Sequence, residues 1–112
     1  MIYVSIVLFA LAAVLGVAIF TKWFSGKGAS QAVIYSHGIA AVVGFLILIY
    51  YAIQNPDSFP KISIILFAIA AVAGLYMFIG DLKKKPHPMA LAVTHALVAV
   101  AGFITLLYFV FV

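Results

Sequence analysis

The chain contains no cysteine and no glutamate, and only two of its 112 residues are acidic. Without cysteine there is no disulfide, no thiolate metal ligand and no covalent c-type haem attachment, so thiols say nothing about the redox compartment. Charged residues make up only 7% of the chain, hydrophobic residues make up 69%, and the mean hydropathy is +1.37. Such a composition cannot cover a surface in contact with water, so it predicts an integral membrane protein.

Four uncharged stretches approach or exceed the roughly 20 apolar residues that a helix needs to cross a bilayer. They are about residues 2–21, 31–53, 62–80 and 89–112. Backbone groups in lipid must be hydrogen-bonded, and these runs are too continuously apolar for the alternating strands of a barrel. The short loops favour antiparallel neighbours. We therefore expect an all-α fold, a four-helix transmembrane bundle that forms one domain over residues 1–112.

The lysines predict how this bundle is oriented. The loops at about residues 22–30 and 81–88 hold five of the six lysines, whereas the second loop balances Lys61 against Asp57. The positive-inside rule then places both lysine-rich loops in the cytoplasm and both termini outside, as in a bacterial-type inner membrane. The first run has no basic start, so we interpret it as a retained helix. Loop orientation and anionic lipid account for the net charge of +4, and no nucleic-acid partner is needed.

The two halves of the chain repeat each other. Residues 5–54 placed without a gap on residues 63–112 give 19 identities in 50 positions, which indicates a tandem duplication. Each repeat holds two helices, so the halves enter the membrane in the same direction. We expect a parallel repeat, with a pseudo-twofold axis along the membrane normal.

His37 and His95 are equivalent positions of this repeat, 58 residues apart. Each lies about 10 Å inside its helix, so the two rings are expected at the same depth. Repeated positions at i, i+4, i+7 and i+11 share one helix face. That face comprises His37, Ala41, Gly44 and Leu48 in the second helix, and His95, Ala99, Gly102 and Leu106 in the fourth. Its small residues permit close helix packing or leave room for a flat ligand.

Several roles are open for this histidine pair. Haem iron takes imidazole ligands on its two opposite faces, and Ala41, Gly44, Ala99 and Gly102 would then accommodate the porphyrin. Two histidines are too few for zinc, which usually needs three or four protein ligands, and copper would lack ligands in the same way. A structural pair of histidines or a role in proton transfer remains an alternative.

The pairing of His37 with Gly44 and of His95 with Gly102 resembles membrane b-type cytochromes, which hold haem between paired histidines of transmembrane helices with small residues alongside. The resemblance covers the second and fourth helices. It implies one haem b with His37 and His95 as metal ligands. It also implies that the protein is an electron carrier more than an enzyme that turns over a substrate. Quinol or superoxide oxidoreductase chemistry, with an unidentified redox partner or quinone, is the implied reaction class. Larger members carry two haems, whereas this chain has membrane histidines for one.

Two other classes of protein are compatible with four apolar helices. Small multidrug exporters have this size, but they use a glutamate in the first helix, and this chain has none. A non-catalytic subunit or assembly partner of a membrane complex needs only an inert bundle, and a homo-oligomer is also open. Outside the helices we expect His87 to be solvated in its loop, and Ser5 and Ser63 to serve capping or packing. Haem propionates would reach the cytoplasmic lysines near Trp23, with no lysine singled out.

Overall fold

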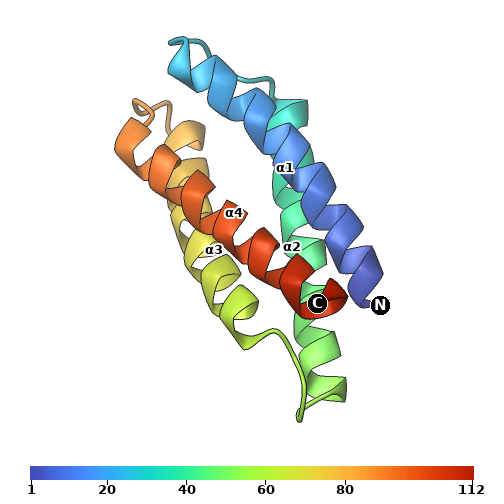
Figure 1. The fold of residues 1–112 in the computed structure, drawn as a ribbon. Helices are drawn as coiled ribbons and strands as arrows, with labels where there is room; N and C mark the ends of the chain where they lie inside the picture. The colour runs from blue at the N-terminus through green and yellow to red at the C-terminus, as the bar shows by residue number, and fades with distance from the viewer.

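The computed structural model describes all 112 residues as four α-helices joined by short loops (Figure 1). Helix α1 spans Ile2–Phe24, α2 Gln31–Gln54, α3 Lys61–Leu82 and α4 Met89–Phe111. Each helix is long and apolar enough to cross a membrane, judged by its length and composition. The prediction of an all-α chain with four such helices is confirmed.

Helices α1 and α3 extend two or three residues past their predicted ends, because a first charged residue does not stop a helix. Lys22 lies in the last turn of α1, where its long apolar stem can follow the helix surface. Both helices end in the same left-handed turn, with Gly26 at φ +77° after α1 and Lys84 at φ +57° after α3. This conformation suits glycine and costs other residues about 1–2 kcal/mol.

The start of α2 follows from a capping side chain. Ser30 stands just before the helix, and its hydroxyl accepts a hydrogen bond from the Val33 N–H at 3.3 Å. Serine satisfies one of the free N–H groups at a helix start in this way. The expected cap is therefore present.

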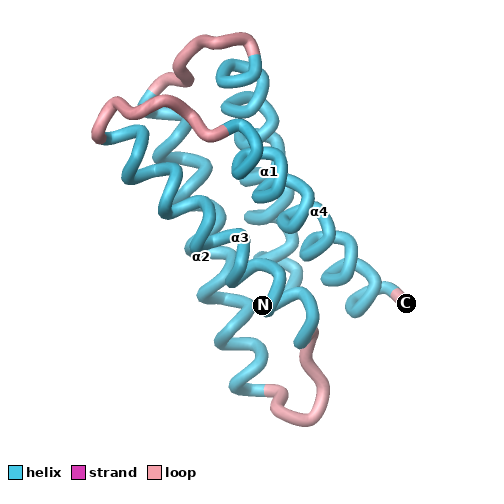
Figure 2. Tube along the Cα trace, turned by 90° about the vertical axis from the view of Figure 1, so that its left-hand side faces the viewer, coloured by secondary structure: helices cyan, strands magenta, loops and turns pink.

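The helices form two antiparallel hairpins, α1–α2 and α3–α4, which pack against each other (Figure 2). The loops at 25–30 and 83–88 lie at one end of the bundle, which we call the lysine-rich end. The loop at 55–60 and both chain termini lie at the other, the terminal end, where the rings of Tyr3 and Phe111 are 6.1 Å apart (Figure 1). Helix α1 touches α2 and α4, and α3 touches the same two helices, so α1 and α3 are diagonal, as are α2 and α4.

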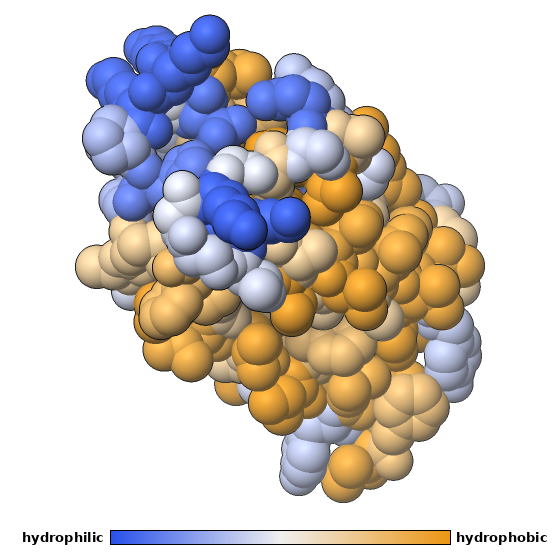
Figure 3. All heavy atoms as spheres, turned by 90° about the horizontal axis from the view of Figure 1, so that it is seen from above, coloured by the Kyte–Doolittle hydropathy of each residue, from blue (hydrophilic) through white to orange (hydrophobic).

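Diagonal pairs fill the centre of the bundle. Leu48 and Leu106 are completely buried, and the rings of Phe9 and Phe67 stack at 4.0 Å with planes 8° apart. Most other large apolar side chains are exposed on the outside of the helices. Figure 3, a view onto the lysine-rich end, shows hydrophilic atoms gathered there and hydrophobic atoms along the flanks. The outward faces of the helices are therefore apolar, whereas those of a water-soluble bundle are polar.

Candidate functional site

His37 and His95 face each other across the centre of the bundle, between the diagonal helices α2 and α4. Their ring centroids are 6.4 Å apart, and the ring planes are inclined by 72°. Both side chains are half-buried. The structure thus brings together the two residues that the repeat singled out, one from each hairpin.

Each imidazole is held by a backbone carbonyl of the neighbouring helix. His37 Nδ1 lies 2.7 Å from the Ala12 carbonyl oxygen, and His95 Nδ1 lies 2.8 Å from that of Ala70. A carbonyl oxygen only accepts, so Nδ1 carries the hydrogen and donates it. In a neutral ring Nε2 then keeps its lone pair. The two hydrogen bonds therefore leave Nε2 of each ring as the nitrogen that can accept a hydrogen bond or bind another group.

Two glycines let the rings lie against the helix backbone. A Cβ atom on Gly16 would be 3.0 Å from His37 Cε1, and a Cβ atom on Gly74 would be 3.0 Å from His95 Cε1. Such a contact is tighter than most real Cβ contacts, so each ring would have to shift by a few tenths of an ångström to admit a methyl group. Together with the carbonyl bonds, this close packing fixes the position of each ring.

Our sequence reasoning missed these four supporting residues, although a signal was present. Ala12 and Gly16 in the first half match Ala70 and Gly74 in the second half at the same offset of 58 residues. Extending the comparison of repeated positions from α2 and α4 to α1 and α3 would have found them. Only the structure shows that they contact the histidines.

Two of the four small residues predicted to line a porphyrin site, Gly44 and Gly102, are buried against phenylalanine rings in this structure. A Cβ atom on Gly44 would lie 3.3 Å from Leu8 Cβ and 3.5 Å from the Phe9 ring, and one on Gly102 would lie 3.1 Å from the Phe67 ring. Ala41 and Ala99, one turn closer to the histidines, are half-buried. The glycines therefore make room for the phenylalanine stack, which borders the histidine layer on the side of the terminal end.

His87 does not behave as the solvated loop residue that the sequence suggested. It is half-buried at the lysine-rich end, where its ring stacks on the Trp23 indole at 3.8 Å with planes 11° apart. Its Nε2 lies 3.0 Å from Asp81 Oδ1. The neighbouring prolines and lysines suggested an exposed loop. The burial of His87 could not be predicted from them, because its contacts are with residues of α1 and α3.

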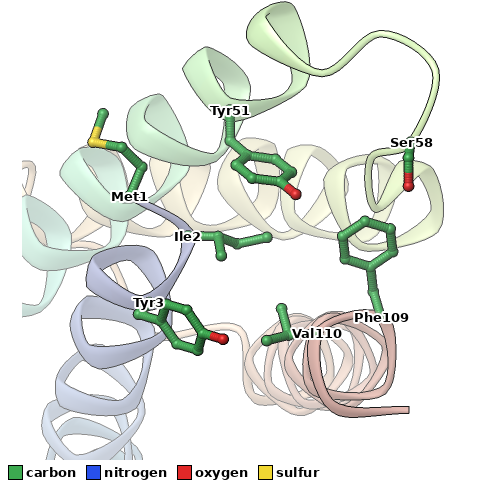
Figure 4. Close-up of a pocket in the computed structure, with 7 residues that line it drawn as sticks. All are labelled: Met1, Ile2, Tyr3, Tyr51, Ser58, Phe109 and Val110. Atoms are coloured by element: carbon green, nitrogen blue, oxygen red, sulfur yellow. The ribbon is translucent and has the colours of Figure 1, made fainter.

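A separate depression of about 500 Å³ opens at the terminal end (Figure 4). Figure 4 shows the Tyr51 ring and the Phe109 ring approaching from different hairpins, with hydroxyl groups as the main polar features. Tyr51 follows His37 by 14 residues, or about 21 Å along α2. The depression is thus distinct from the histidine layer. Its lining consists of Met1, Ile2, Tyr3, Tyr51, Ser58, Phe109 and Val110.

The ligand set of the histidine layer restricts what it could hold. The structure contains no group of three or more His, Cys, Asp or Glu side chains that could bind a metal ion. Zinc sites with three or four protein ligands are therefore not formed. Two imidazoles suit a metal ion whose remaining coordination positions are filled by a group other than the protein, such as a macrocycle.

No protein-family model, curated protein or solved structure matches this chain. The assignment of a function therefore depends on the geometry of the site.

Proposed function

We propose that the chain is an integral membrane protein that binds one haem b between His37 and His95. The observation that carries this proposal is the symmetric pair of imidazoles, each hydrogen-bonded through Nδ1 to a backbone carbonyl. Ligating histidines usually donate their second ring nitrogen in this way, which fixes the tautomer and strengthens the ligand.

The spacing of the two rings also supports ligation of a single metal ion. A metal–imidazole bond is about 2.0–2.1 Å long, so two rings on opposite sides of one ion have centroids a little over about 6 Å apart. The centroids of His37 and His95 are separated by 6.4 Å. This separation fits two imidazoles bound to one metal ion, and it also lies in the ordinary range for packed rings, since the rings of Tyr51 and Phe109 have the same centroid separation of 6.4 Å.

The chain's own residues would bind and orient the cofactor. His37 and His95 would hold the iron through Nε2, while the carbonyls of Ala12 and Ala70 orient the two rings. The half-buried Ala41 and Ala99 lie one turn away. The Phe9–Phe67 stack would form an apolar wall on the side of the terminal end. Haem with both axial positions filled supplies outer-sphere electron transfer more readily than oxygen binding, so an electron carrier is the proposed role.

Insertion into a bilayer is supported by the distribution of exposed residues. Apolar side chains cover the flanks of the four helices, and only 17 of 112 residues are buried within the chain, so the apolar surface needs lipid to cover it. We propose that the lysine-rich end faces the cytoplasm. Because the chain has no cysteine, Ser25→Cys and Ser58→Cys would each introduce a unique label. A membrane-impermeant maleimide should label Ser58→Cys in intact cells and leave Ser25→Cys unlabelled; the reverse pattern would overturn the orientation.

The decisive experiment is an optical spectrum of the detergent-purified protein, oxidised and then reduced with dithionite, after expression with an adequate supply of haem. We expect a sharp Soret band and split α and β bands in the reduced state, typical of six-coordinate b-type haem. A colourless protein that also fails to take up added hemin would refute the proposal.

A further inference from the structure

A second polar cluster joins the two hairpins at the lysine-rich end. Asp81 on α3 accepts a hydrogen bond from His87 Nε2 at 3.0 Å, and His87 stacks on Trp23 of α1 at 3.8 Å. The side chains of His87 and Asp81 are only 23% and 14% exposed. We call Trp23, Asp81 and His87 the end cluster.

The end cluster has unused hydrogen-bonding capacity. Trp23 Nε1 and Asp81 Oδ2 are buried, and neither has a hydrogen-bond partner within the protein. A buried donor or acceptor without a partner is unfavourable, and such groups usually bind water or a ligand. The Trp23 Nε1–H donor and the Asp81 Oδ2 acceptor are therefore the two groups beside His87 to which a water molecule that delivers a proton would bind.

Helix geometry connects this cluster to the histidine layer. Ala12, Gly16, Ile19 and Trp23 follow the spacing i, i+4, i+7 and i+11 on α1, and Ala70, Gly74, Met77 and Asp81 follow it on α3. Ile19 and Met77 are buried, so both faces point inward. Trp23 and Asp81 therefore lie about 10 Å beyond the glycines that touch the ligating rings.

Among the charged and titratable groups around the end cluster, His87 is the one suited to accept a proton. Histidine is the side chain whose ordinary protonation range overlaps physiological pH. A protonated imidazole would keep both the hydrogen bond to Asp81 and the stacking contact with Trp23. The charged groups on neighbouring elements are all exposed lysines, the α4 start carries no charge, and α2 contributes only the exposed Tyr35. These lysines are Lys22, Lys27, Lys83, Lys84 and Lys85.

We propose that the end cluster takes up one proton when the site between His37 and His95 is reduced, so that the protein couples electron transfer to proton uptake at its lysine-rich end. This proposal rests on the proposed haem function. One electron comes from a one-electron reductant and one proton comes from water at that end. The carboxylate accepts from His87 Nε2, so Nε2 already carries a hydrogen and the new proton binds Nδ1. The positive charge that this proton adds to His87 would be attracted to an electron held between His37 and His95.

The test is the reduction potential of the haem-loaded protein in detergent, measured by spectroelectrochemical titration at several pH values between about 5 and 8. We expect the potential to fall as the pH rises, with a slope of at most about 59 mV per pH unit for one proton per electron. His87→Phe keeps an aromatic ring on Trp23 and removes the imidazole, so the slope of its potential against pH should be smaller than that of the unmodified protein. Asp81→Asn removes the carboxylate that accepts from His87 Nε2, so its slope should also be smaller than that of the unmodified protein.

Asp57→Asn is the matched control, because it removes the only other acid, on the exposed loop at the terminal end. Its slope should equal that of the unmodified protein. A pH-independent potential in the unmodified protein, or an unchanged slope in both His87→Phe and Asp81→Asn, would overturn the coupling while the haem spectrum stays intact. A protein that binds no haem would instead overturn the proposed function together with this inference.

Discussion

The two hairpins agree at the centre of the bundle and differ at its ends. In each hairpin a histidine donates to an alanine carbonyl 25 residues earlier in the chain and lies against a glycine of the neighbouring helix. At the ends the equivalent positions have diverged. Trp23 corresponds to Asp81 at the lysine-rich end, and Tyr51 corresponds to Phe109 at the terminal end.

The histidine layer and the ends of the bundle therefore differ in how closely the two hairpins must match. The contacts of the histidine layer recur in both hairpins, as the ligand proposed to lie on an axis between them would require. At the ends of the bundle the equivalent positions hold different residues, so the two hairpins do not share the same contacts there. We therefore expect paired substitutions in the histidine layer to have equal effects, whereas substitutions nearer the ends act on contacts that the two hairpins do not share.

The largest expected effect is the loss of an axial ligand. His37→Ala and His95→Ala should each abolish the low-spin haem spectrum, because one remaining imidazole cannot fill both axial positions. Haem content per chain and the shape of the reduced bands would measure this loss.

His87→Ala is the control for the histidine substitutions and should retain the low-spin spectrum. Equal haem content and equal spectra in all three proteins would contradict the ligand assignment. Loss in only one of the two central variants would contradict the symmetry of the site.

A smaller and again symmetric effect is expected at the two glycines. Gly16→Ala and Gly74→Ala would each place a Cβ atom 3.0 Å from an imidazole carbon, so the ring must move. Disturbing the groups that orient a metal ligand typically lowers affinity about 10- to 100-fold. Titration of the apoprotein with hemin would measure this change.

Gly80→Ala is the matched substitution on α3, because nothing lies within 4 Å of its added Cβ atom. It should leave the affinity for hemin unchanged. If Gly16→Ala also bound hemin as tightly as the unmodified protein, close packing of the ring would not be needed for ligation.

The sequence predicted the elements of this fold well, because hydropathy alone determines four apolar runs of this length. It also predicted the inward face of α2 and α4, since repeated positions at helical spacing include the completely buried Leu48 and Leu106. The porphyrin ligands remain a prediction. The structure adds a geometry of the two rings that is compatible with it.

The contacts between helices could not be predicted from one sequence. The repeat marked Gly44 and Gly102 as small, but it could not show that the Phe9 and Phe67 rings occupy the space beside them. Likewise, His87 between two prolines looked like a solvated residue. Its burial depends on α1 continuing far enough to bring Trp23 beside the opposite hairpin.

The smallest expected effect concerns two serines near the terminal end, where the hairpins differ. Ser5 donates to the Gly44 carbonyl at 2.8 Å, whereas its equivalent, Ser63, pairs with the Thr105 hydroxyl at 2.8 Å. Both serines are buried. Ser5→Ala and Ser63→Ala should each lower the free energy of unfolding by about 0.6 kcal/mol, the average for hydrogen bonds between membrane helices. Unfolding by SDS in mixed micelles would measure these values.

Thr105→Ile sharpens the comparison, because it gives the second hairpin an isoleucine like Ile47 of the first. Ser63 could then donate to the Gly102 carbonyl as Ser5 donates to the Gly44 carbonyl, so stability should change by less than about 0.5 kcal/mol. If the two hairpins do not share this geometry, the buried Ser63 hydroxyl would lose its partner at a cost of about 1–3 kcal/mol. A loss of that size would show that the second hairpin depends on Thr105, and that the equivalence seen in the histidine layer stops before the terminal end.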